Sequence, residues 1–136
     1  MARRIYRAKN CIKYRESTLS PYPVLRVKLY NVMFESYGEL ELQIDTGFEG
    51  SILLRAEDYE FFQVGELPRD YWRTYRTLSG NIIMRVARAL MEVNGRRYEV
   101  YVESPLYGGG KNLIGREVIN NLVLVLDGPK NECCLV

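Results

Sequence analysis

The stretch that decides the fold is residues 39–48, which read ELELQIDTGF. Apolar and polar side chains alternate strictly up to Asp45, as in a half-buried β-strand whose two leucines and isoleucine share one face. A small hydroxyl residue and a glycine, Thr46-Gly47, follow the aspartate. A glycine lets the backbone turn sharply and bring its amides close to a carboxylate. The stretch therefore predicts a strand that delivers one carboxylate to a tight turn.

The segments around this strand also predict β-structure. Before it, residues 24–30 (VLRVKLY) are rich in β-forming residues. After it come two long β-like stretches, residues 71–78 and 82–93, separated by small polar residues as in a hairpin. Further strands are expected at residues 51–54, 98–103, 113–115, 122–126 and 132–136, and short helices at residues 56–62 and 116–121. We interpret the chain as an all-β domain of residues 21–136 preceded by a basic extension, residues 1–20.

The length and composition are those of one globular domain. The chain has 136 residues, of which 47% are hydrophobic and 26% are charged, and this balance argues against general disorder. No apolar stretch approaches the roughly 18 residues of a membrane span. No apolar run follows the basic residues at the start, so we expect no secretory signal, no membrane partner and a cytoplasmic location.

The chain contains no histidine, which excludes several kinds of catalysis. Ser-His-Asp and Cys-His nucleophile systems need an imidazole as the base. Zinc sites with imidazole ligands are excluded too, and the spacing of the cysteines fits no metal motif. We therefore expect no metal and no other cofactor. Any catalysis must rely on carboxylates, lysine, tyrosine or cysteine.

The three cysteines are Cys11, Cys133 and Cys134. An odd number does not suit a disulfide scaffold, and neighbouring cysteines are poorly placed to bond to each other. We expect all three to be free, small hydrophobic residues in a reducing compartment.

Charge is spread unevenly, although the formal net charge is only +2. Residues 1–18 contain six arginines and lysines and one glutamate. Such a basic arm can bind nucleic acid. However, isoleucines and tyrosines interleave with the charges, which fits equally well with a docked strand or helix that has one solvated face. We do not expect nucleic acid as a partner.

A second motif, Leu113-Ile114-Gly115-Arg116, follows the predicted hairpin. Three features occur in a fixed order along the chain: a hydrophobic residue before Asp-Thr-Gly, a hairpin with a glycine at its tip, and two aliphatic residues before Gly-Arg. In this the chain resembles the retropepsin-like (retroviral-type) aspartic proteases of clan AA, over residues 24–127. Its Asp-Thr-Gly-Phe motif is also similar to that of a prokaryotic and archaeal branch of the clan.

The resemblance implies a retropepsin-like, closed or partly open β-barrel with a flap hairpin and one or two short helices. Asp45 would be the catalytic carboxylate, in an active-site loop with Thr46, Gly47 and Phe48. Thr46 would be buried against a facing loop, and Phe48, which replaces a small residue of the viral enzymes, would narrow the neighbouring subsite. The flap tip would be formed by Leu78, Ser79, Gly80 and Asn81. The active-site loop would be supported from beneath by Leu113, Ile114 and Gly115.

The reaction implied by this resemblance needs two carboxylates. One, ionised, takes a proton from water, and the other, protonated, binds the scissile carbonyl. This chain has one Asp-Thr-Gly, and its other aspartates, Asp58, Asp70 and Asp127, are not followed by Thr-Gly or Ser-Gly. The second carboxylate would therefore be Asp45 of a second copy across a two-fold axis.

We expect an aspartic endopeptidase, a hydrolase that is active as a homodimer on an extended peptide or protein substrate. The alternative is a non-catalytic peptide- or protein-binding module that keeps the protease fold, since fold does not fix function. In viral relatives the chain ends interleave across the dimer, and residues 132–136 are apolar enough to do so. An edge strand within the chain is an equally good interpretation.

Overall fold

The computed structural model describes residue 5 and residues 7–136, whereas residues 1–4 and 6 of the predicted extension lie outside the described part. Strands make up most of the regular structure, which confirms the predicted all-β class. They are β1 (Lys9–Lys13), β2 (Val24–Tyr30), β3 (Ser36–Ile44), β4 (Ile52–Leu53), β5 (Arg73–Thr77), β6 (Gly80–Val93), β7 (Arg96–Pro105), β8 (Leu113–Ile114), β9 (Leu124–Asp127) and β10 (Glu132–Leu135).

The helices of the described residues are all short. They are α1 (Ala56–Tyr59), α2 (Arg116–Ile119) and the 3-10 helices η1 (Glu60–Gly65) and η2 (Arg69–Tyr71). Both predicted helices are present, and η1 extends the first of them. None of the helices in the described part of the chain is long and apolar enough to cross a membrane.

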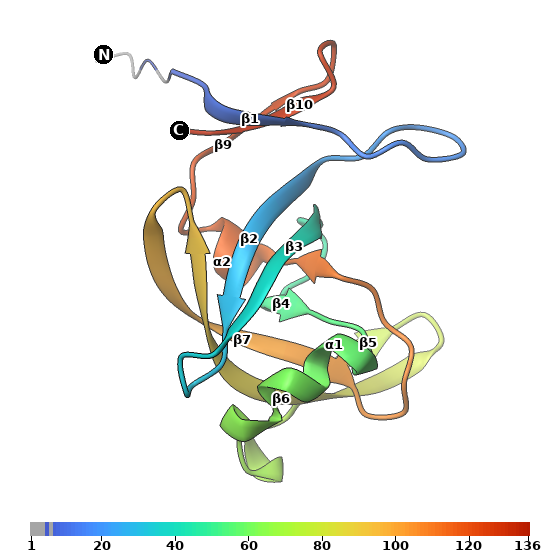
Figure 1. Cartoon of the computed structure of the whole chain (residues 1–136). Helices are drawn as coiled ribbons and strands as arrows, with labels where there is room; N and C mark the ends of the chain where they lie inside the picture. Colours follow the sequence, from blue (N-terminus) through green and yellow to red (C-terminus); the bar gives the residue numbers. More distant parts are fainter. Residues whose placement is uncertain (1–4, 6) are drawn as a thin grey trace, which may run out of the picture.

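Seven strands form one sheet that closes on itself (Figure 1). Their order is β2-β3-β8-β4-β7-β6-β5, and an additional pairing between β2 and β6 closes the barrel. The short strand β8 runs parallel to β3 and antiparallel to β4. It therefore lies between the strands that enter and leave the Asp-Thr-Gly turn.

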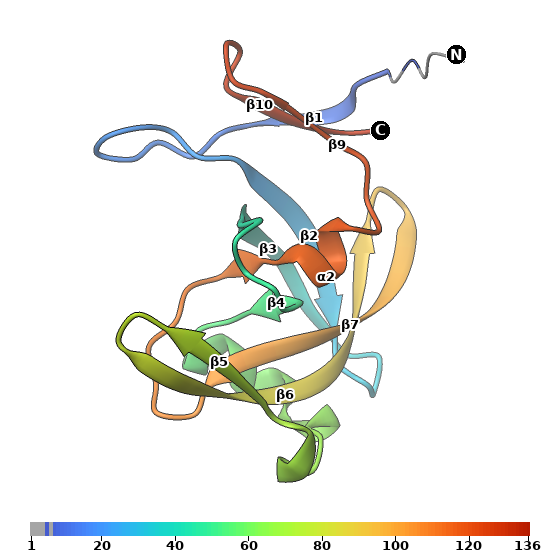
Figure 2. The same ribbon diagram turned by 180° about the vertical axis from the view of Figure 1, so that it is seen from behind.

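The barrel encloses the main hydrophobic core. Inward-facing residues alternate along β2 and β6, so Val27, Leu29, Ala89 and Met91 are buried while their neighbours Arg26, Lys28 and Arg88 are exposed. Helices α1 and η1 lie below the barrel in the view from behind (Figure 2) and contribute the fully buried side chains of Tyr59 and Phe62. The alternation that predicted the strands is thus the alternation that builds the core.

A second, three-stranded sheet joins the two ends of the chain at one end of the barrel (Figure 1). Its order is β1-β10-β9. One interpretation of residues 132–136 was an edge strand. In the structure β10 is an internal strand of this sheet, because it pairs with β9 on one side and with β1 on the other. Part of the predicted extension therefore contributes a strand, and Lys13 Nζ lies 3.5 Å from Glu132 Oε1. The domain division at residue 20 stays a prediction.

The cysteine prediction is wrong for two of the three residues. Cys11 lies directly opposite Cys134 in the β1–β10 pair, and the two form a disulfide bond. They are 123 residues apart in the sequence, and no spacing rule indicates that the two chain ends pair. Cys133 is free and buried, as expected, and burial raises the pKa of its thiol to about 11.

The β5–β6 hairpin turns more tightly than the sequence predicted. The sequence predicts residues 79–81 between the two strands, whereas β6 begins at Gly80 and the turn is Leu78-Ser79. Thr77 pairs with Gly80, and Oγ1 of Thr77 donates a hydrogen bond of 2.7 Å to the carbonyl oxygen of Gly80. Gly80 has a φ of +118°, which a residue with a side chain rarely adopts.

Candidate active site

Asp45 begins the loop between β3 and β4, residues 45–51, which we call the candidate active-site loop. The backbone N–H of Asp45 donates to the carbonyl oxygen of Ile114 at 3.0 Å, so β8 continues to hold the chain beyond the end of β3. The N–H of Phe48 donates to the carbonyl oxygen of Asp45 at 3.2 Å. The N–H of Gly47 donates to the side-chain Oδ1 of Asp45 at 2.9 Å. The turn therefore fixes the position of the carboxylate.

The Asp45 carboxylate is accessible and has no cationic partner among the described residues. Its side chain is half-buried, and Thr46 and Gly47 beside it are exposed. Thr46 was predicted to be buried against a second active-site loop that faces it. The single chain holds one such loop, so this burial stays a prediction. By contrast, the carboxylates of Asp58 and Glu103 are engaged with arginines and tyrosine hydroxyls. Among the side chains of the described residues, none donates a hydrogen bond to the Asp45 carboxylate, so it is free to act on another molecule.

Leu113, Ile114 and Gly115 lie directly against the candidate active-site loop. Ile114 is fully buried and pairs with Ile44 of β3 on one side and with Ile52 of β4 on the other. Leu113 pairs in the same way with Gln43 and Leu53. The N–H of Gly115 donates to the carbonyl oxygen of Ser51 at 2.7 Å. A Cβ at this glycine would lie 2.3 Å from the carbonyl oxygen of Gly50. Only glycine allows the loop to approach this closely.

Phe48 belongs to the candidate active-site loop, and its side chain packs against the β5–β6 hairpin. Its ring centroid lies 5.4 Å from that of Tyr75 on β5. Its Cδ2 would be 2.6 Å from a Cβ at Gly115. Both aromatic rings join a small cluster with Leu53, Met84 and Leu113. The side chain therefore stabilises the loop against the hairpin, and its predicted effect on a subsite stays a prediction.

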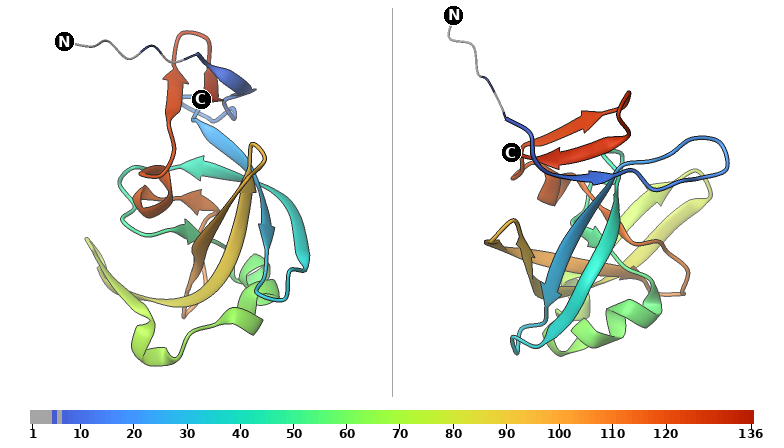
Figure 3. Two further views of the ribbon diagram at one scale, coloured as in Figure 1. Left: turned by 90° about the vertical axis from the view of Figure 1, so that its left-hand side faces the viewer. Right: turned by 45° about the horizontal axis from the view of Figure 1, so that its top comes forward.

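The residues predicted at the flap tip lie at the free end of the β5–β6 hairpin. Leu78, Ser79, Gly80 and Asn81 are all exposed, and the side chain of Leu78 makes almost no contact within the chain. The hairpin extends to the same side of the molecule as the loop that follows β3 (Figure 3, left). Four separate sequence segments are thus arranged around one face: the Asp-Thr-Gly turn, the hairpin, β8 and α2.

A cavity of about 530 Å³ lies between the candidate active-site loop, β5 and α2. Charged side chains dominate its lining, which includes Glu49, Arg73, Tyr75, Arg76 and Glu117. A cavity of this size accommodates one or more side chains of an extended peptide. Its position next to the loop makes it a candidate subsite.

Sequence reasoning missed the buried glutamate behind this cavity. Glu103 has no exposed surface, although a charged residue near the end of a strand usually points to solvent. The only sequence signal was its place at the end of a predicted strand, residues 98–103 (YEVYVE), in which the other glutamate, Glu99, is exposed. Burial raises the pKa of Glu103, and the hydrogen bonds from Tyr75 and Ser51 and the charge of Arg73 lower it by less. Burial and the hydrogen bond to Glu103 also raise the pKa of Tyr75.

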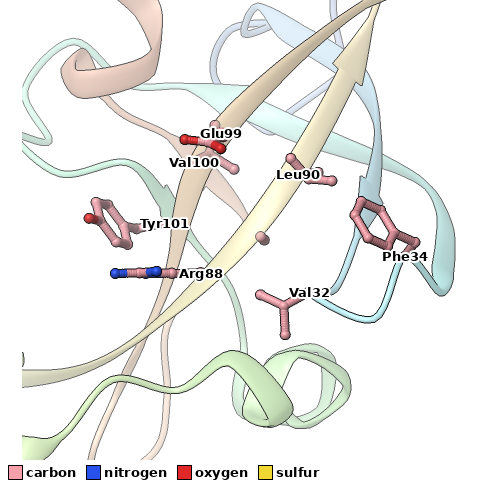
Figure 4. Close-up of a pocket in the computed structure, with 8 residues that line it drawn as sticks. Val32, Phe34, Arg88, Leu90, Glu99, Val100 and Tyr101 are labelled. Carbon is pink, nitrogen blue, oxygen red and sulfur yellow. The ribbon is translucent and has the colours of Figure 1, made fainter.

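Two other features lie outside the candidate site. An open pocket of about 560 Å³ is lined by the β2–β3 turn, with Val32 and Phe34, and by residues 88–90 of β6 and 99–101 of β7 (Figure 4). None of the predicted site residues lines it. Among the described residues, Cys11, Glu132 and Cys134 are close enough together to hold a metal ion. The disulfide occupies both sulfurs, so this group offers no thiolate ligand.

The closed barrel, the long hairpin and the Asp-Thr-Gly turn above β8 define the class: the chain has the retropepsin-like fold of aspartic proteases. Among solved structures, it is similar to the EIAV protease complexed with the inhibitor HBY-793, with a TM-score of 0.52, 16% identity and coverage of 79% of this chain and 93% of that chain. A retropepsin-like aspartic protease from Rickettsia conorii matches with a TM-score of 0.49, 15% identity and coverage of 86% and 94%. No protein-family model and no curated protein matches the sequence.

The likeness to the EIAV protease, with its TM-score of 0.52, confirms the predicted retropepsin-like fold. At 16% identity, the similarity to the viral enzyme establishes the arrangement of the strands and not the activity.

Proposed function

We propose that the chain is an aspartic endopeptidase that acts as a homodimer and hydrolyses an extended peptide or protein. Each protomer would contribute one Asp45 to a shared site. The similarity to a prokaryotic and archaeal branch of the clan and the cytoplasmic location are parts of the same proposal.

One observation carries the proposal. Asp45 lies on a turn that is held by backbone hydrogen bonds, with its carboxylate accessible and without a cationic partner among the described residues. A carboxylate that only stabilised the fold would be paired like Asp58, whose oxygens accept from Tyr37, Arg55 and Asn112. In the retropepsin-like fold, this exposed position is where two copies of the chain would bring two carboxylates together.

The chemistry follows from the proximity of the two carboxylates. Two such groups within hydrogen-bonding distance cannot both be ionised, so they share one proton. The ionised Asp45 takes a proton from a water molecule, which attacks the scissile carbonyl, while the protonated partner donates a hydrogen bond to the carbonyl oxygen. The β5–β6 hairpin would cover the peptide, whose backbone would lie extended between the hairpin and the two loops.

The direct test is the variant Asp45→Asn, assayed on a library of unstructured peptides. An amide keeps the shape of the carboxylate but cannot take a proton from water, so we expect cleavage to fall by at least roughly 10²–10⁴-fold. The matched control is Asp58→Asn, the same chemical change at a buried carboxylate outside the site, which should still cleave. Cleavage by the Asp45→Asn protein at the wild-type rate would contradict the proposal. Peptide binding without cleavage by the wild type would favour a peptide-binding module.

A further inference from the structure

Glu103 is a fully buried carboxylate that no step of the proposed reaction uses. It lies on β7, where its residue pairs with Val86 of β6 and with Leu53 of β4. Burying a carboxylate is unfavourable unless donors surround it. Glu103 therefore needs a structural or functional reason.

Three donors satisfy this carboxylate, and they come from two parts of the candidate site. The backbone N–H of Ser51, at the end of the candidate active-site loop, donates to Oε2 at 2.8 Å. From β5, the hydroxyl of Tyr75 donates to Oε1 at 2.5 Å and Nη1 of Arg73 donates to Oε2 at 3.1 Å. The two oxygens of Glu103 thus join the loop of Asp45 to the first strand of the hairpin.

Arg73 extends this connection to the third element of the site. Its Nη1 lies 3.1 Å from Oε2 of Glu117 on α2, and its Nη2 donates to Oε1 of the same residue at 3.2 Å. Helix α2 in turn holds the loop through its backbone. The N–H of Arg116 donates to the carbonyl oxygen of Phe48 at 2.8 Å, and the N–H of Glu117 donates to that of Gly50 at 3.1 Å.

The packing around these hydrogen bonds leaves no room for either element to move alone. A Cβ at Gly50 would lie 2.4 Å from Oε2 of Glu103 and 2.5 Å from the hydroxyl oxygen of Tyr75. The ring of Phe48 also packs on that of Tyr75. A shift of β5 would therefore either break buried hydrogen bonds or push the loop with it.

We propose that Glu103 is a positioning residue that couples β5 of the β5–β6 hairpin to the candidate active-site loop, so that movement of the hairpin on a bound peptide is transmitted to Asp45. The effect on catalysis rests on the proposed function, but the coupling itself can be measured without any activity. The partners of the coupling are Ser51, Tyr75 and Arg73.

The coupling is tested by amide hydrogen exchange on the variant Tyr75→Phe, which removes one hydroxyl on β5 and leaves the aromatic packing in place. The probes are the amides that bond to or within the loop: Ser51, Gly115, Arg116 and Glu117. We expect their exchange to accelerate at least about tenfold, the ratio that the loss of one buried hydrogen bond produces, together with that of residues 73–77. Acceleration confined to residues 73–77 would overturn the proposal.

The matched control is Asp58→Asn, because Asp58 is also a buried carboxylate that binds a tyrosine hydroxyl and an arginine. It contacts neither β5 nor the candidate active-site loop. Because Asp58→Asn lowers the stability of the whole domain, exchange is measured under conditions in which the four probe amides open locally and not by global unfolding, and we expect this variant to leave their exchange unchanged. Equal acceleration in this variant would show that the probe amides report the general loss of stability and would overturn the proposal.

Peptide cleavage gives the second readout. A loop displaced by a fraction of an ångström reduces kcat, so we expect Tyr75→Phe and Glu103→Gln to lower kcat between roughly tenfold and a hundredfold with little change in KM. Unchanged kcat in a Tyr75→Phe protein whose wild type cleaves would reject the positioning role. If the wild type itself does not cleave, the proposed function fails, and the exchange experiment still decides the coupling.

Discussion

Gly50 packs so closely against Glu103 that a Cβ added to the glycine would lie 2.4 Å from Oε2 of the glutamate. The loop that carries Asp45 and the buried carboxylate therefore fit each other without spare volume. Because glycine is the residue without a Cβ, this fit depends on the identity of residue 50 as much as on that of residue 103.

The first prediction follows from this contact. Gly50→Ala should lower the free energy of unfolding by about 1–3 kcal/mol, because the new methyl group overpacks a buried polar cluster. The measurement is urea denaturation at one fixed protein concentration, since a dimer's stability depends on concentration. The control is Gly128→Ala, where an added Cβ would meet nothing within 4 Å and the change should stay within about 0.5 kcal/mol. Equal effects of the two substitutions would contradict the packing described here.

The Cys11–Cys134 bond predicts the number of reactive thiols. Protein prepared with oxidised glutathione and then unfolded without reductant should be alkylated at Cys133 alone, whereas reduced protein should take three labels. The bond closes a loop of more than a hundred residues, so Cys11→Ser should lower the stability of the oxidised protein by about 4–5 kcal/mol in the chain-entropy model. Three labels on the unreduced, unfolded protein would show that the chain ends are not linked.

Asp58 predicts how stability depends on pH. Burial raises the pKa of Asp58, but the hydrogen bonds from Tyr37 and Asn112 and the charge of Arg55 together lower it below the usual value. A carboxyl whose folded pKa is lowered contributes stability above its unfolded pKa, about 3.9, and loses this contribution as the pH falls through the folded pKa.

Wild type should therefore be more stable than Asp58→Asn by about 1–3 kcal/mol at pH 7, and the difference should shrink below about pH 4. Urea denaturation of both proteins at pH 7 and at a pH below about 4 gives the difference in free energy of unfolding under each condition. In the folded wild type, the same hydrogen bond, together with burial, raises the pKa of Tyr37 to about 12. A difference between the two proteins that stays constant down to pH 2 would contradict the role given to Asp58.

Local patterns made part of the site predictable. Two motifs could be recognised because each consists of a few adjacent residues: the strict alternation before Asp45 and the aliphatic pair before Gly115. The resemblance to the retropepsin-like proteases related the two motifs to each other. The structure places them in contact through the Asp45–Ile114 hydrogen bond. The same patterns indicated β2, both strands of the hairpin and the two short helices.

The remaining features depend on register between distant segments, which no local pattern encodes. Glu103 is buried because Ser51, Arg73 and Tyr75 converge on it from segments that are 28 to 52 residues away. Cys11 meets Cys134 because β1 pairs with β10, and that pairing makes β10 an internal strand, whereas one of our two interpretations made it an edge strand. Strand β6 begins two residues earlier than predicted, at Gly80, and the hydroxyl of Thr77 donates a hydrogen bond to the carbonyl oxygen of that glycine.

The central claim, one Asp45 from each of two chains, is tested most directly by mixing wild-type and Asp45→Asn protein in equal amounts under conditions of proven subunit exchange. Random pairing makes a quarter of the dimers wild type on both sides, and only these hold two carboxylates. We therefore predict that peptidase activity per total dimer approaches one quarter of that of the wild type, given that a covalently linked wild-type/Asp45→Asn dimer is inactive. Activity of one half, with exchange proven by mass labelling, would mean that each chain works alone and would contradict the shared site.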